Sequence, residues 1–277
     1  MSTDYTLAYG THASPDDGRC AMEWVSHLAG EPHSDAPACV SPVLRAFCTA
    51  LNDSLDDAPR QRLRPYLTRT IGTAHDGLDE ARSWMCMDWL IRVYTPTWLG
   101  LARLTDAAAP LTALQPVVDV PDLKLALAAL EDARREARGA WTAALRAARG
   151  KAWAVPWAAG RSAAREAAWS SAGAAAWAAA RLGVGDIAGD RARAAARAAA
   201  GDAAAAAARE ARAGCERAAA KEAARCALEP TLSALNESAL TLLDRMLPTE
   251  MLVTDGEPSG AGAGRLIASE VAGERVG

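Results

Sequence analysis

Thiol, carboxylate and imidazole side chains gather near the N-terminus of the chain. Cys20, Glu23 and His27 are spaced at i, i+3 and i+7, which places them on one face of a helix expected over residues 14–30. The loop expected to follow adds three more such groups, His33, Asp35 and Cys39. Brought together, groups of these types bind a transition metal or form a nucleophile and its base around a cysteine.

The cluster between Cys20 and Cys39 has two chemical interpretations. As a metal centre it would use four ligands, Glu23, His27, His33 and Asp35. As a catalytic centre it would use four acid–base groups, Glu23, His27, Asp35 and Asp88. The spacing matches neither an established zinc signature nor HExxH, and no motif identifies a cofactor. A structural interpretation stays open, in which Cys20 is a core residue and Glu23 and His27 are an ordinary helical pair.

Asp88 is included because it lies in the most apolar of the expected helices, residues 77–94, where an unpaired carboxylate is costly. Arg92 follows one turn later, and this spacing predicts a structural i, i+4 ion pair. Alternatively, Asp88 faces Glu23 across the core. Two carboxylates in that position could share a proton or a metal, as they do in some helix bundles.

A basic stretch, residues 134–165, is the third candidate. It contains eight cationic residues, one acid (Glu136) and three tryptophans, Trp141, Trp153 and Trp157. Cations interleaved with aromatic rings are typical of surfaces that bind nucleic acid or an anionic membrane. The structural alternative is that the tryptophans fill space between alanine-rich helices while the arginines face water. The net charge of −4 for the whole chain favours that alternative.

Helical signals extend over most of the chain. Ser41-Pro42 is an N-cap followed by proline at the first helical position, and 13 of the 20 residues from Arg191 to Glu210 are alanine, the strongest helix former. The sequence therefore predicts an all-α protein with four parts. These are an N-terminal helical domain (1–106), a linker (107–121), a bundle of long Ala/Arg-rich helices (122–253), in which one helix lies between Pro230 and Pro248, and a disordered tail (254–277).

Composition excludes several classes of protein. The six cysteines form no CxxC motif and no signal peptide precedes them, so we expect a cytoplasmic protein with reduced thiols. No apolar run is long enough to span a membrane. The sequence contains no GxGxxG, Walker or GxSxG motif and no strand–helix alternation, which disfavours the common α/β enzymes. Residues 1–121 carry a charge of −6 and residues 122–229 a charge of +6.

Residues 18–105 resemble a family of uncharacterised proteins from high-GC bacteria and their phages. The matching positions are Cys20-Ala21-Met22-Glu23, Leu28-Ala29-Gly30-Glu31, Ser34-Asp35, Pro37, Cys39-Val40-Ser41-Pro42-Val43, Asn52-Asp53 and Asp88-Trp89-Leu90. The resemblance implies no particular activity, but it directs attention to the first half of the chain. Alanine-rich runs such as Ala163 to Ala180 are also similar to those of helical immunity-type proteins of toxin systems.

Three functions are therefore compatible with the sequence. The first is a non-catalytic helical binding or scaffold protein, immunity-like in character, whose partner is another protein or a second copy of the chain. The second is an enzyme or ligand-binding protein with its Cys/Glu/His/Asp site in the N-terminal domain, with or without a metal. The third is binding of anions or nucleic acid by residues 134–165, which the acidic chain disfavours. We rank the first highest, because alanine-rich helices offer long faces but few converging polar groups.

Overall fold

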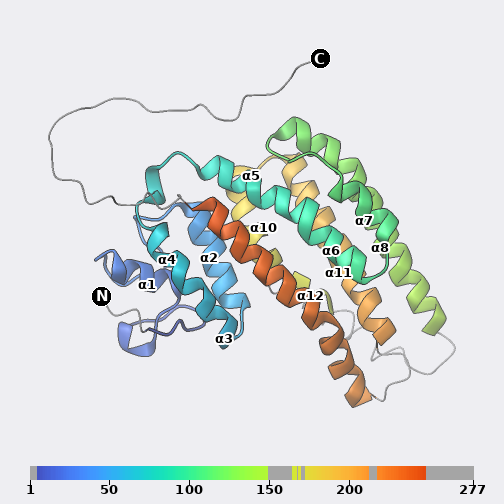
Figure 1. Ribbon diagram of the computed structural model, residues 1–277, viewed down its shortest axis with the longest axis horizontal. Helices are drawn as coiled ribbons and strands as arrows, with labels where there is room; N and C mark the ends of the chain where they lie inside the picture. Colours follow the sequence, from blue (N-terminus) through green and yellow to red (C-terminus); the bar gives the residue numbers. More distant parts are fainter. Residues whose placement is uncertain (1–4, 149–163, 167, 170–171, 212–216, 248–277) are drawn as a thin grey trace.

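The computed structural model describes residues 5–148, 164–166, 168–169, 172–211 and 217–247 (Figure 1). Within these ranges all regular elements are helices and none is a strand, which confirms the all-α prediction. None of these helices is both long enough and apolar enough to span a bilayer. The predicted tail, residues 254–277, lies outside the described residues, as do Trp153 and Trp157.

Short helices make up the N-terminal half. They are α1 (Ala21–Leu28), α2 (Pro42–Ser54), α3 (Asp57–Arg60), α4 (Arg64–Thr70), α5 (Asp79–Trp89) and α6 (Thr95–Leu101), with a π-helical segment, Leu90–Tyr94, joining the last two. As the sequence predicts, the Ser41 hydroxyl caps α2 by accepting from the Leu44 amide at 3.4 Å.

The first helix begins later than the sequence signals indicate. Ser14-Pro15 starts only a single 3-10 turn, Pro15–Asp17, which ends at Gly18. Gly18 has a φ of 121°, a backbone conformation that side-chain-bearing residues rarely adopt, so the helix cannot continue through it. The chain re-enters helix at Ala21 with Cys20 as the N-cap, and Cys20 is therefore not on the helix face predicted for it.

The second half contains α7 (Thr105–Thr112), α8 (Val120–Ala148), α10 (Ala172–Gly183), α11 (Ile187–Ala211) and α12 (Arg217–Met246), of which α8, α11 and α12 are the longest of the described helices. Two expectations are wrong here. The predicted linker is helical over α7, which contains Pro110, and Pro230 lies inside α12 instead of preceding its helix. Both prolines are accommodated within a helix, although proline usually marks a boundary.

The two halves share one continuous core. Helix α10 packs against α2 and α5, and α12 crosses from the second half over the first (Figure 1). The predicted boundary at residues 107–121 therefore does not separate two cores. Because α10 is nearly all alanine and glycine, its backbone lies very close to its neighbours, and this close approach merges the halves.

Polar contacts hold α12 on the N-terminal half. The indole Nε1 of Trp89 donates to Ser238 Oγ at 2.8 Å, and the buried guanidinium of Arg82 donates from Nε to the Met246 carbonyl oxygen at 2.9 Å. An Arg69–Asp244 ion pair lies at the same end of α12. Arg82 also pairs with Asp76, so it connects the C-terminal end of α12 to the loop before α5.

Candidate functional site

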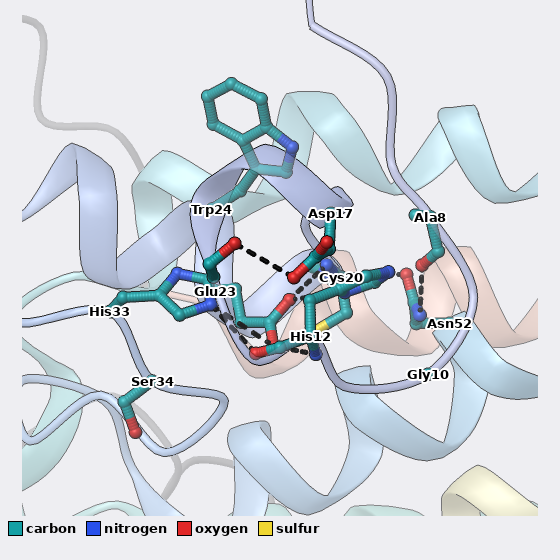
Figure 2. A network of polar contacts seen from close by, with 12 residues as sticks. Ala8, Gly10, His12, Asp17, Cys20, Glu23, Trp24, His33, Ser34 and Asn52 are labelled. Carbon is teal, nitrogen blue, oxygen red and sulfur yellow. Dashed lines mark hydrogen bonds and ion pairs between the residues drawn. The ribbon is translucent and has the colours of Figure 1, made fainter.

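The Glu23 carboxylate is the centre of a buried polar network (Figure 2). Its side chain is only 1% exposed. Oε1 accepts the His12 amide N–H at 2.7 Å, and Oε2 accepts both the Cys20 amide N–H at 2.7 Å and the His12 ring at Nδ1, 2.8 Å away. Three donors therefore converge on one carboxylate, and all of them come from residues 12–20.

Local sequence explains why Glu23 takes this position. It is the third residue of α1, from which a glutamate side chain reaches back to the N-cap amide, as in a capping box. Asn52, on α2, holds the same segment from the other side. Its Oδ1 accepts the Ala21 amide at 3.2 Å and its Nδ2 donates to the Ala8 carbonyl at 3.0 Å. The segment from residue 5 to residue 20 is thus fastened to both α1 and α2.

Two histidines flank the carboxylate. Because His12 donates from Nδ1 to Glu23, its Nε2 carries the lone pair when the ring is neutral. His33 donates from Nε2 to the His12 carbonyl oxygen at 3.0 Å, and the same nitrogen lies 3.8 Å from Glu23 Oε1. The side chains of His12 and His33 are 12% and 20% exposed, so both rings reach the edge of the network.

The protonation states of the cluster follow from these contacts. Burial raises the pKa of Glu23, but the hydrogen bonds from the His12 and Cys20 amides and the His12 ring outweigh it, so its pKa lies below the ordinary value and the group is a carboxylate at neutral pH. Burial raises the pKa of the Cys20 thiol to about 12. Cys20 is therefore a protonated thiol at neutral pH, and it is neither a nucleophile nor a metal ligand in this state.

The structure brings together only part of the predicted site. Glu23 and His33 meet, as expected. His27 does not join them, because it lies on the exposed side of α1 with its ring edge against Trp24, at a centroid distance of 5.4 Å. Among the contacts of the described residues, Glu23 has none with Asp35. Within the same residues, no group of three or more His, Cys, Asp or Glu side chains is arranged to hold a metal ion.

His12 is the member of the network that the sequence analysis missed. It lies two residues before the expected helix, and its contact with Glu23 depends on how residues 5–20 fold back. Gly18 lies close to the His12 ring, and this approach is visible only in the structure. A Cβ atom at Gly18 would lie 3.1 Å from His12 Nε2.

Asp88 belongs to a different part of the molecule. It pairs with Arg92 at 3.1 Å, as the structural interpretation predicted, and it accepts the Val117 amide N–H at 2.8 Å. These contacts fasten the segment before α8 to α5. The alternative in which Asp88 faces Glu23 is wrong, because in the described part of the chain the partners of Asp88 are Arg92 and Val117.

The basic stretch is described only as far as residue 148 and from residue 164. In the first part Trp141 is 6% exposed and packs in the core, consistent with the space-filling role considered for it. Arg134 and Arg135 pair with Glu131 and Asp132 on their own helix. These two guanidinium groups are therefore at least partly neutralised.

A groove between α7 and α8 has a mixed apolar and charged lining. Its volume is about 570 Å³, and its walls include Leu104 and Pro110 on one side and Ala129 and Ala133 on the other. Leu125, which is 75% exposed, lies on the same lining. Together with the exposed Ala128 and Pro110, Leu125 forms an apolar patch with a polar rim, which is a feature of interaction surfaces.

Replacing Glu23 with Gln is expected to lower the free energy of unfolding by about 1–2 kcal/mol, because a buried charge-assisted network loses its charge and one acceptor. The loss should shrink at low pH. A carboxylate whose folded pKa is lowered stabilises the fold above its unfolded pKa of about 4, and that stabilisation disappears as the pH falls through the folded pKa. Urea unfolding at pH 7 and at pH 3 measures both effects. An equal loss at the two pH values would contradict this account.

The chain has no match among the known proteins with which it was compared. No family model, no curated protein and no solved structure matches the chain.

Proposed function

We propose that this chain is a non-catalytic helical binding or scaffold protein that recognises another protein. The observation that carries the proposal is the α7/α8 groove, where an apolar floor and the exposed side chain of Leu125 are open to solvent. Helix α8 packs along α11, so one wall of the groove is fixed to the centre of the bundle (Figure 1). A rigid wall lowers the entropy lost when a partner binds.

The Glu23 network supports the same proposal by its use of polar groups. Its three strong hydrogen bonds all come from the chain itself, and the nearby thiol is protonated. A catalytic centre directs such groups toward a substrate position, whereas this network directs them toward its own loop. Glu23 therefore stabilises the fold of residues 5–28 in this interpretation.

A second candidate function rests on His12. Glu23 fixes its Nδ1 proton, which leaves Nε2 as a base at the edge of the network, an arrangement shared with acid–base catalysts. This arrangement favours the enzyme or ligand-binding alternative, and the experiment below therefore tests both candidates. A His12→Phe variant keeps the ring volume and removes both nitrogens, so it separates the two candidates.

Photo-crosslinking in the cells that make the protein tests the proposal. A benzoylphenylalanine at position 125 should give one discrete protein adduct, and the adduct should persist in the His12→Phe background. Leu182 on α10 is the matched control position, because it is also a large exposed apolar residue, at 51%. No adduct at position 125, or the same adduct at both positions, would contradict the proposal. Loss of the adduct in folded His12→Phe protein would favour the second candidate.

A further inference from the structure

The α7/α8 groove carries information about the charge of its partner. Three carboxylates line it, on Asp106, Asp132 and Glu136, against one guanidinium, on Arg103, so the lining has a net charge of −2. Asp132 pairs with Arg135. Asp106 and Glu136 are exposed, and among the described residues neither has an ion-pair partner. Two carboxylates are thus free to meet a cation on an incoming molecule.

The spacing along α8 suggests the shape of that molecule. Leu125, Ala128 and Ala129 give one turn of α8 an exposed or partly exposed apolar surface, and the exposed Asp132 and Glu136 follow on the next two turns. From residue 125 to residue 136 the helix rises roughly 16 Å, about three turns. The lining therefore presents an apolar turn followed by two acidic residues along the axis of one helix.

We infer that the groove binds a cationic amphipathic helix of a partner protein, and this inference rests on the function proposed above. Apolar side chains of that helix cover Leu125, Ala128 and Ala129, and its Lys or Arg residues lie against Asp106 and Glu136. An amphipathic helix in a groove is a common mode of protein recognition. The acidic lining repels nucleic acid and anionic lipid, so neither is the occupant.

The test uses the full-length protein and a synthetic probe. The probe is a fluorescent helical peptide of about five turns, with leucine on one face and lysine at i, i+4 on the other. We expect it to bind, as measured by fluorescence anisotropy at low ionic strength. A peptide with every lysine replaced by glutamate should bind much more weakly. Added salt should weaken the binding of the lysine peptide, because salt screens exposed charges.

Matched variants locate the binding. The Asp106→Asn/Glu136→Gln protein should bind the lysine peptide about fivefold more weakly, from the loss of two exposed charge pairs. Asp16→Asn/Glu229→Gln changes the net charge by the same amount at exposed positions outside the groove lining, and it should leave the affinity unchanged. Circular dichroism confirms that each variant is folded.

Other outcomes separate the inference from the function on which it rests. Equal weakening in both double variants would mean that the peptide senses only the total charge, and the inference would be wrong. If the glutamate peptide bound, or if neither peptide bound, the inference of a cationic partner would be wrong. A crosslinked adduct at position 125 would then still show that the groove is a binding surface. Absence of that adduct as well would overturn the proposed function itself.

Discussion

Replacement of Arg82 by Met is expected to lower the free energy of unfolding by about 3–5 kcal/mol, the range for removing one member of a buried ion pair. The side chain of Arg82 is 1% exposed. Its NH1 and NH2 groups donate to the two oxygens of Asp76, at 2.8 and 2.5 Å, and its Nε donates to the Met246 carbonyl. Methionine fills similar space but leaves the carboxylate and the last turn of α12 without a donor.

The Arg82–Asp76 pair should also make the free energy of unfolding depend on pH. The hydrogen bonds from Arg82 hold the pKa of Asp76 below its ordinary value. A carboxylate shifted in this direction stabilises the fold above its unfolded pKa of about 4, and that contribution is lost as the pH falls through the lower folded value. The Arg82→Met protein should therefore lose less stability than the unsubstituted protein between pH 5 and pH 2.

Guanidinium chloride unfolding across this pH range measures both effects. Arg135→Met is the control, because it breaks an exposed i, i+3 pair with Asp132 and should change the free energy of unfolding by no more than about 0.5 kcal/mol. If Arg82→Met were as mild as Arg135→Met, the contact between α5 and the end of α12 would not contribute as described.

The second large effect is expected at Gly173, where α10 meets the ring of Tyr94. A Cβ atom at this position would lie 2.6 Å from two ring carbons. Tyr94 is 1% exposed, and its hydroxyl donates to the Ala168 carbonyl at 2.6 Å, so the ring has little room to move. Gly173→Ala should therefore destabilise the protein by about 2–3 kcal/mol through overpacking.

Gly139 on α8 provides the opposite case. A Cβ atom there meets nothing within 4 Å, so Gly139→Ala should stabilise the protein by about 0.5–1 kcal/mol through helix propensity alone.

Combining Gly173→Ala with Tyr94→Leu makes room for the new methyl group. Thermal unfolding of the single and double variants should therefore show less than additive losses. Additive losses would indicate that Tyr94 does not cause the effect.

The sequence could predict only part of the candidate site. The Glu23–Cys20 contact is local, three residues apart, so helix spacing brought attention to both residues. His27 satisfied the same spacing but lies on the exposed side of α1. His12 had no spacing to identify it, because its contact with Glu23 is made by an irregular loop that Asn52 holds from another helix. The α7/α8 groove could not be predicted from the sequence either, since α7 begins just before, and extends into, the segment predicted to be a linker.

By itself, the sequence determined most of the helical segments, though not α7 or the start of α1, because helix formation depends largely on contacts within a few residues. Ser41-Pro42 starts α2, alanine maintains α11, and the Gly183 to Gly185 break separates α10 from α11. Only the tertiary structure decided which helices pack together and which charges are buried. Arg193 and Asp202 belong to an alternation of charged and alanine residues like those at the surface, yet both are buried on α11. Asp202 pairs with a residue distant in sequence, Arg165, and local spacing does not encode such a contact.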